Sequence, residues 1–372
     1  MKILVNSKDP NGISYLLYKQ GMKNIPDIKF NDFKNYQKYD VVLFFKYQLH
    51  HQDLIDARKN NNKIIIGIID PRQNLSKKIT QEIDFLVVDS IEMKDYYLSL
   101  NKPIIFYYEF ESTISPKIKT QDEAIYIGYH GNKVHLLSMF PSITNALGKL
   151  SKKYNLKILL LYNHNKLGKL PEFITKNINF EYLQWNQTNL KYFLSKVDIG
   201  IVPNFKPVIF KRFLKYLSLP FLNLFATHNS DYLVRFKMTS GPNRILTFAA
   251  NKIPVVSDMY PSACQIINHE NDGFLVFSEA GWYDSIERLI KEPILRENIS
   301  NNMHQKFKTN FDFEIQNERF LRELNNLDIK LKNRELNILN SRSVNILIRP
   351  FFYFSINELY LVLKKQLKRL FK

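Results

Sequence analysis

Short apolar runs rich in β-branched residues, with amphipathic segments between them, recur along most of the chain. In the first third such runs occur at residues 2–6, 40–45, 63–69, 85–90 and 103–109. A strand of a parallel sheet is apolar on both sides when helices cover both faces of the sheet. The alternation therefore predicts an α/β fold built on a doubly wound parallel sheet.

The same alternation starts again after a polar segment at 112–124, which is typical of a linker. Further strands are predicted at 124–131, 157–162, 178–183, 198–203, 253–258 and 273–277. A chain of 372 residues is long enough to bury two cores. We therefore expect Rossmann-like domains at 1–118 and 119–330, facing a cleft at the carboxyl ends of their strands, and a tail at 331–372.

Charge and cysteine content limit the partners and the compartment. The net charge of +18 suits an acidic partner, but it equally suits a lysine-rich compositional bias, and both interpretations stay open. The basic residues form no known nucleic-acid recognition module, so nucleic acid is not an expected partner. Cys264 is the one cysteine, and the N-terminus lacks a signal-peptide core, so we expect a cytoplasmic protein. No run of about 18 uncharged apolar residues predicts a spanning helix.

The stretch "RFKMTSGPNRILTFAANKIPVVSD", residues 235–258, predicts a loop, a helix and a buried strand. Ser240 or Gly241 suits the N-cap, and Pro242 suits the first turn. The free amides and partial positive charge of a helix start favour an anion. Three cations surround this start: Arg235, Lys237 and Arg244. The stretch predicts a diphosphate site, with a solvated cationic loop as the alternative.

Three segments in order carry a family resemblance: "DIGIVPN", the stretch above, and "NDGFLVFSEAGWYDSIERLIKEPILREN". Together they resemble the C-terminal half of GT-B glycosyltransferases, close to the large retaining family 4, over about residues 124–325. Residues 1–118 resemble that fold only in their general pattern of strands. The resemblance implies transfer of a hexosyl unit from a nucleoside-diphosphate sugar to a glycan or lipid-linked acceptor, for example in cell-surface polysaccharide biosynthesis.

The sequence departs from the family at two positions. Family members usually carry two glutamates eight positions apart, and Thr239 and Thr247 stand there in this chain. A threonine hydroxyl can accept a ribose hydrogen bond but brings no charge. A non-catalytic nucleotide-sugar-binding or scaffolding protein therefore stays open as the alternative function. Arg244 falls within a residue of the family's phosphate-binding lysine, so the resemblance implies diphosphate binding there.

The resemblance also implies roles for other residues. On the donor side it implies Gly128, Gly131, Lys133, Arg235, Ser240, Gly241, Asn243 and Thr247. Catalytic roles fall to Arg244 and Lys237, which stabilise the leaving diphosphate, and to Asp70, which orients an acceptor hydroxyl. Gly12, Ser14 and Arg72 are expected on the acceptor side, although "DP" at 70–71 is also an ordinary turn. No Asp-x-Asp signature occurs, so we expect a metal-independent enzyme without cofactor.

Two segments interrupt the alternation. Residues 205–234 are aromatic and basic, and a lid, a patch for a lipid-linked acceptor and a buried helical hairpin are all compatible with them. The stretch 341–372 has seven Lys or Arg against one acid, with apolar residues at helical spacing. Such a basic amphipathic helix suits peripheral contact with the inner membrane face, and packing on the N-terminal domain is the compatible alternative.

Overall fold

The computed structural model describes residues 1–46, 51–71, 75, 77–118, 123–172, 178–207, 234–235 and 241–334. Two six-stranded sheets dominate the fold, and every strand pair within them is parallel. A small antiparallel pair, β11 (Lys206–Pro207) and β12 (Val234–Arg235), lies at the two ends of the predicted insert. The residues between them lie outside the described part of the chain.

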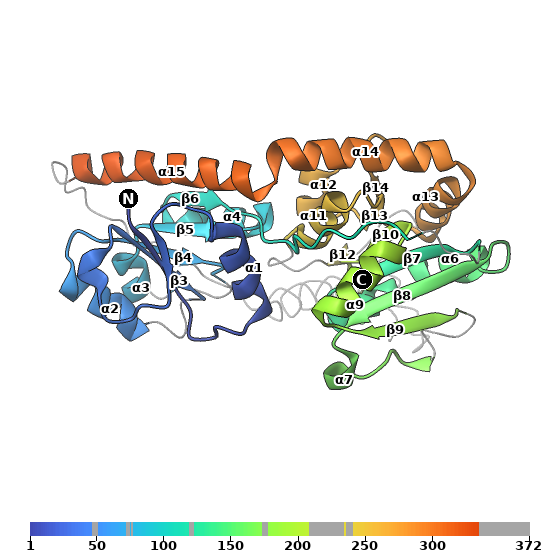
Figure 1. Ribbon diagram of the computed structural model, residues 1–372, viewed down its shortest axis with the longest axis horizontal. Helices are drawn as coiled ribbons and strands as arrows, with labels where there is room; N and C mark the ends of the chain where they lie inside the picture. The colour runs from blue at the N-terminus through green and yellow to red at the C-terminus, as the bar shows by residue number, and fades with distance from the viewer. Residues whose placement is uncertain are drawn as a thin grey trace, which may run out of the picture.

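The N-terminal sheet has the order β2-β1-β3-β4-β5-β6. Its strands are β1 (Ile3–Asn6), β2 (Ile28–Phe30), β3 (Val41–Phe45), β4 (Ile65–Ile69), β5 (Phe85–Val88) and β6 (Ile104–Phe106). Every residue of β3 and β4 is buried, because helices cover both faces of the sheet. One face packs on α1 (Ile13–Met22) and α15 (Phe313–Arg334), the other on α2 (His51–Asn60), α3 (Lys77–Glu82) and α4 (Ile91–Tyr97). Figure 1 shows α15 running along the N-terminal sheet.

The C-terminal sheet has the order β14-β13-β10-β7-β8-β9. Its strands are β7 (Ile125–His130), β8 (Leu156–Tyr162), β9 (Phe180–Gln184), β10 (Ile199–Val202), β13 (Val255–Asp258) and β14 (Phe274–Val276). One face packs on α6 (Ser142–Leu150) and α13 (Glu279–Lys291), the other on α9 (Gln187–Lys196), α11 (Asn243–Ala250) and α14 (Pro293–Asn310). Short helices α5 (Lys133–Leu136), α7 (His164–Leu167) and α12 (Pro261–Ile266) follow β7, β8 and β13.

The predicted α/β class and the strands predicted from apolar runs are confirmed. Each of the predicted runs contains one strand, with ends that differ by a few residues. No apolar run predicts β2, because Ile28–Phe30 has three residues of which only Ile28 is buried. The helix predicted near Ser240 begins at Asn243, with Pro242 at the N-cap position and no side-chain cap.

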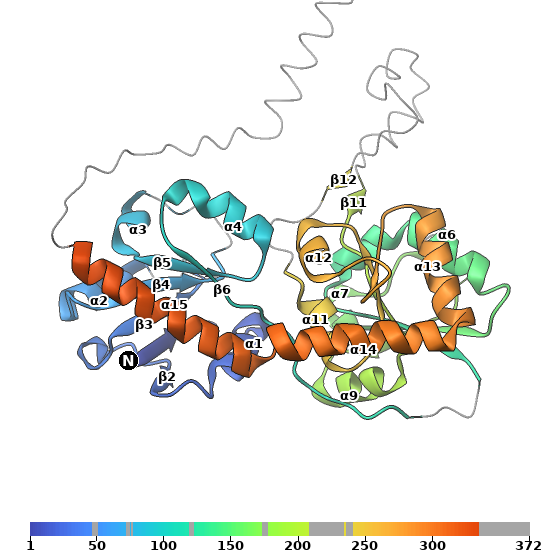
Figure 2. The same cartoon turned by 90° about the horizontal axis from the view of Figure 1, so that it is seen from above.

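The chain returns to the N-terminal sheet through α14 and α15. Figure 2 shows α14 over the C-terminal sheet and, continuing from it, α15 over the N-terminal sheet. Asn317 of α15 accepts a hydrogen bond from the Tyr107 hydroxyl (2.8 Å) and donates to the Gly21 carbonyl (3.0 Å). Phe320 and Leu324 are fully buried in the same core. The chain therefore reaches the N-terminal core well before residue 330, where we predicted the end of the C-terminal domain.

The carboxyl edges of the two sheets face each other. Glu92, on α4 after β5, accepts a hydrogen bond from the backbone N–H of Ser262 at the start of α12 (3.0 Å) and bonds the Ser262 hydroxyl. A Cβ atom placed on Gly241 would lie 2.3 Å from Oδ2 of Asp89, which directly follows β5. These contacts join loops after β5 to loops that precede α11 and follow β13, so the strand ends of both sheets meet in one region.

Within the described residues, no helix combines the length and the apolar character that a membrane crossing requires. The predicted basic tail, 341–372, lies outside the described residues.

We predict that Asn317→Ala lowers the free energy of unfolding by about 1–3 kcal/mol, because it leaves the buried Gly21 carbonyl and Tyr107 hydroxyl without their partner. Urea unfolding followed by circular dichroism measures the change. Asn326→Ala is the matched control, since Asn326 is exposed on the same helix. Equal loss of stability in the two variants would contradict the role given to the Asn317 amide.

Candidate functional site

The C-terminal sheet changes direction between β7 and β10. The chain runs from β7 outward to β8 and β9, then returns to β10 on the other side of β7. The loops that follow two such strands diverge and leave a space at the carboxyl ends of the strands. Ligands of doubly wound sheets bind in this space. His130 ends β7 here, and Pro203 and Asn204 follow β10. This switch point is the first candidate for a ligand site.

Arg244, in the first turn of α11, reaches into this switch point. Its guanidinium donates to the Pro203 carbonyl (2.8 Å) and lies 3.5 Å from Oδ1 of Asn204. Its Cζ lies 5.7 Å from the centre of the Tyr129 ring. Arg244 is only 5% exposed, yet it makes no ion pair within the described residues. A buried guanidinium without an ion-pair partner favours an anion.

Gly131 makes room for this arginine. Its φ of +136° lies in the region that side chains other than glycine rarely adopt. A Cβ atom at this position would also lie 2.9 Å from the Tyr129 hydroxyl oxygen and 3.2 Å from Cδ of Arg244. The glycine of the "HGNK" loop is therefore required both by its backbone and by the close approach of Arg244.

Several buried polar side chains follow the same strand ends. At the ends of β7, β10 and β13, three buried side-chain atoms have no hydrogen-bond partner among the described residues: Nε2 of His130, Nδ2 of Asn204 and the hydroxyl of Tyr260. His130 is 8% exposed, and the other two are fully buried. Leaving a buried polar group without a partner costs about 1–3 kcal/mol. A polar ligand that bonded these atoms would recover that cost.

The electrostatics of the switch point keep His130 neutral. Burial lowers the pKa of His130 to about 3, and the positive charge of Arg244 lowers it further in the same direction. A neutral imidazole can donate to a phosphate oxygen or accept from a sugar hydroxyl, depending on its tautomer. Burial raises the pKa of Tyr129 to about 12, so its hydroxyl stays protonated and donates to the Asn132 carbonyl (2.7 Å).

Asp258, the last residue of β13, holds the loop after β10. Its Oδ2 accepts hydrogen bonds from the backbone N–H groups of Asn204 (2.6 Å) and Phe205 (2.8 Å). Burial raises the pKa of this carboxyl to about 6, against the lowering effect of these N–H donors, the Trp282 side chain and Arg244. Near neutral pH the carboxylate fixes the backbone whose Pro203 carbonyl positions Arg244.

The structure gives Gly128 and Lys133 specific neighbours. Gly128 lies inside β7, where a Cβ atom would meet Val197 at 2.3 Å and Phe193 at 2.7 Å, so packing against α9 explains this glycine. Lys133 begins α5 at the strand-end side of the sheet, and its ammonium donates to the Leu167 carbonyl (2.7 Å). Lys133 therefore joins the loops after β7 and β8 beside the switch point.

Thr247 faces the segment that connects the two sheets. Its hydroxyl donates to the Asn243 carbonyl (2.9 Å) and accepts from the backbone N–H of Glu111 (3.1 Å). Only 1% of Thr247 is exposed. Both hydrogen-bonding directions of this hydroxyl are thus used within the protein.

Part of the predicted diphosphate site lies outside the described residues. Lys237, Thr239 and Ser240 lie outside the described residues, as does Arg72 on the acceptor side. Of Arg235 the structure describes the backbone, which pairs with Lys206 in the small antiparallel sheet. Gly241 is buried against Asp89, and Asn243 is half-buried at the first position of α11.

On the N-terminal sheet, the predicted residue Asp70 pairs with Lys46. These residues directly follow β4 and β3, and the ammonium of Lys46 lies 3.8 Å from Oδ2 of Asp70. Both residues have left-handed backbones, with φ of 53° for Asp70 and 56° for Lys46. Gly12 and Ser14 lie at the start of α1, after β1, where Gly12 occupies the N-cap position. All these predicted acceptor-side residues stand at the carboxyl edge.

Sequence reasoning missed five residues of the two facing edges: Lys46, Asp89, His130, Asn204 and Tyr260. Each lies at or within two residues of the carboxyl end of a strand. That position is a signal the sequence does carry, because polar residues at strand ends of a doubly wound sheet are candidates for ligand contacts. Which of these side chains is buried, and what lies beside each of them, depends on the packing of distant segments, which the sequence does not display.

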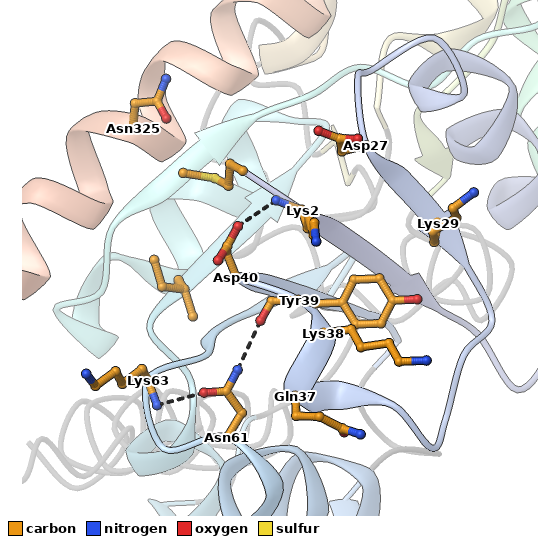
Figure 3. A pocket seen from close by; sticks show the side chains of 12 residues that line it. Lys2, Asp27, Lys29, Gln37, Lys38, Tyr39, Asp40, Asn61, Lys63 and Asn325 are labelled. Atoms are coloured by element: carbon orange, nitrogen blue, oxygen red, sulfur yellow. Dashed lines mark hydrogen bonds between the residues drawn. The ribbon is translucent and has the colours of Figure 1, made fainter.

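The hollow drawn in Figure 3 lies at the opposite edge of the N-terminal sheet. It has a volume of about 1010 Å³, and residues from the starts of β1, β3 and β4 line it, with Asn325 of α15. Four exposed lysines surround it: Lys2, Lys29, Lys38 and Lys63. It is remote from the facing carboxyl edges, so we do not assign it to the candidate site.

No protein-family model and no curated protein sequence matches this chain. Solved structures do match its fold. HepE from Anabaena, in complex with UDP, has a TM-score of 0.59 at 11% identity, over 88% of this chain and 100% of HepE. Sucrose-phosphate synthase from Thermosynechococcus elongatus has a TM-score of 0.57 at 10% identity, over 89% of this chain and 100% of the synthase.

TarM from S. aureus has a TM-score of 0.51 at 12% identity, over 77% of this chain and 55% of TarM. These structural neighbours are GT-B glycosyltransferases of the retaining family 4 type. The predicted GT-B fold is therefore confirmed, and the chain is structurally similar to glycosyltransferases that use nucleotide sugars.

The raised pKa of Asp258 predicts a pH dependence of stability. Because the folded-state pKa of about 6 exceeds the usual 3.8, the folded protein holds this proton more tightly. The protonated Asp258 carboxyl therefore adds about 3 kcal/mol to the free energy of unfolding below pH 4. This contribution is lost as the pH rises through 6. We expect Asp258→Asn to remove this loss in urea unfolding between pH 4 and 7.

The matched control for this prediction is Asp284→Asn, which changes an exposed carboxylate on α13. It should keep the pH profile of the wild type. An Asp258→Asn profile as steep as that of the wild type would show that another group is responsible.

Proposed function

We propose that the protein is a glycosyltransferase that moves a hexosyl unit from a nucleoside-diphosphate sugar to a glycan or lipid-linked acceptor. One observation carries the proposal. The buried Arg244 has no ion-pair partner among the described residues, and it stands at the switch point of the C-terminal sheet. The fold supports it, since HepE, with the same fold, has been crystallised with UDP and with UDP-glucose.

In this proposal the diphosphate lies between the Arg244 side chain and the N-terminal end of α11. Bond cleavage leaves negative charge on the diphosphate, and a pre-placed guanidinium and helix start stabilise that charge. His130, Asn204 and Tyr260, whose polar atoms lack partners in the described part of the chain, would bond the remaining donor oxygens. Lys133, Asn243 and the loop at Gly131 would complete the donor side, with Gly241, Arg235, Lys237 and Ser240 from the preceding segment.

The acceptor would bind on the facing edge of the N-terminal sheet. Asp70 would orient the accepting hydroxyl there, beside Gly12, Ser14 and Arg72. A retaining reaction suits this division of roles, because an oxygen of the leaving diphosphate can itself take the proton of the acceptor. We further propose that the enzyme works in the cytoplasm on cell-surface polysaccharide, with the tail 341–372 on the inner membrane face.

One observation favours the second candidate function, a non-catalytic nucleotide-sugar-binding or scaffolding protein. The hydroxyl of Thr247 already donates to the Asn243 carbonyl and accepts from the Glu111 N–H, and only 1% of the residue is exposed, so a ribose hydroxyl has little access to it. Such a protein would bind the nucleotide without transferring sugar. Binding with no transfer over a broad panel of donors and acceptors would favour it over the enzyme.

We predict that one of UDP, GDP, ADP, CMP and dTDP binds with micromolar affinity in calorimetry. Arg244→Gln should weaken this binding about 10- to 100-fold, because a charge-assisted hydrogen bond to phosphate contributes about 1.5–3 kcal/mol. Arg288→Gln is the matched control, since Arg288 lies on α13 and its guanidinium pairs with the Glu270 carboxylate. Unchanged affinity of a folded Arg244→Gln variant would contradict the donor site.

A further inference from the structure

Lys46 and Asp70 form a pair of equivalent residues on neighbouring strands. The strands β3 and β4 are paired in parallel up to Phe45 and Ile69, so Lys46 and Asp70 are the next residues across from each other. The backbone N–H of Lys46 donates to the Ile69 carbonyl, and that of Asp70 donates to the Val87 carbonyl, both at 3.0 Å. These bonds hold both residues at the carboxyl edge of the N-terminal sheet.

Both residues keep an unfavourable backbone conformation. Residues other than glycine with φ near +55° are uncommon, and lysine has no side-chain group that compensates locally. Such strain persists where the surrounding structure enforces it, and it gathers at functional sites. Two adjacent strained residues of opposite charge at a strand edge therefore indicate a binding position.

The ammonium of Lys46 is available to a ligand. Its contacts among the described residues are the Asp70 carboxylate at 3.8 Å and the face of the Phe45 ring at 4.9 Å. The distance to Asp70 exceeds that of a charge-assisted hydrogen bond, so the pairing leaves the N–H donors of Lys46 unused. Lys46 is 32% exposed, whereas Asp70 is 1% exposed, so the cation is the accessible member of the pair.

A second lysine at this edge, Lys8, differs from Lys46 because it pairs directly with a carboxylate. Lys8 lies in the loop after β1, on the other side of the point where the N-terminal sheet changes direction. Its ammonium makes a direct ion pair with Asp53 at 2.8 Å. The charge of Lys8 is thus neutralised, whereas that of Lys46 is only loosely compensated.

The position of Lys46 along the carboxyl edge gives its distance from the proposed donor site. Asp89, after β5, lies against Gly241 at the start of α11, so the end of β5 is next to the proposed donor site. Strand β3 is two strands away from β5, and neighbouring strands lie about 4.8 Å apart, which places Lys46 about 10 Å from that point. A sugar ring with an anionic substituent spans about this distance.

We propose that the acceptor is a sugar carrying a phosphate or carboxylate group, and that Lys46 binds this anionic group. The inference rests on the proposed function, since it places an acceptor opposite the nucleotide sugar. Asp70 then holds the ammonium of Lys46 in place.

The test is calorimetry on the full chain saturated with UDP, which blocks the donor diphosphate site. The probes are glucose 6-phosphate, glucuronic acid, inorganic phosphate and glucose. We expect one of the anionic sugars to bind at least about tenfold more tightly than glucose. Whether the phosphate or the uronic acid binds identifies the anion.

Lys46→Asn removes the charge, and it suits the backbone because asparagine adopts positive φ readily. It should weaken binding of the anionic sugar by about tenfold or more and leave UDP binding unchanged, whereas Lys46→Arg should retain binding within a few-fold. Lys8→Asn is the matched control and should bind like the wild type.

Equal binding by wild type and Lys46→Asn, or no preference for either anionic sugar over glucose, would overturn the inference. The UDP titration in the same samples separates the two claims. Loss of anionic-sugar binding with intact UDP binding concerns the acceptor alone, whereas a wild-type protein that binds no nucleotide contradicts the proposed function.

Discussion

The guanidinium of Arg244 and the Pro203 carbonyl form the contact on which the candidate site depends. It joins the first turn of α11 to the end of β10, across 41 residues of sequence. Asp258 supports it from the next strand by holding the N–H groups of Asn204 and Phe205. Gly131 gives the arginine its space, and His130 stays neutral beside it. The result is a cation fixed in position at the place where doubly wound sheets bind ligands.

The two sheets are held so that this cation faces a second set of strand ends. The linker bonds α11 through Glu111 and Thr247, α15 bonds the N-terminal core through Asn317, and Glu92 bonds the start of α12. These contacts come from separate parts of the chain. Because they all join the same two bodies, they keep the N-terminal edge opposite the C-terminal switch point, which a transfer between two substrates requires.

Much of the fold could be predicted from the sequence, because buried parallel strands leave continuous apolar runs. The exception, β2, is too short and too exposed to leave one. The sequence also predicts a site role for Arg244, from its position after a helix-start signal, and for Asp70, from its position after an apolar run, and both stay predictions. It could not show that Arg244 is buried without an ion pair among the described residues, since that depends on the segment around Pro203. Nor could it show Lys46 beside Asp70, because that contact depends on the register of β3 and β4.

The most direct test is a crystal structure of the protein soaked with UDP. We expect the diphosphate within hydrogen-bond distance of the Arg244 guanidinium, with further contacts to the side chains of His130 or Asn204. UDP bound elsewhere, for example among the lysines of the hollow in Figure 3, would contradict the assignment of the donor site. A switch point that stays without nucleotide at saturating UDP would contradict it equally.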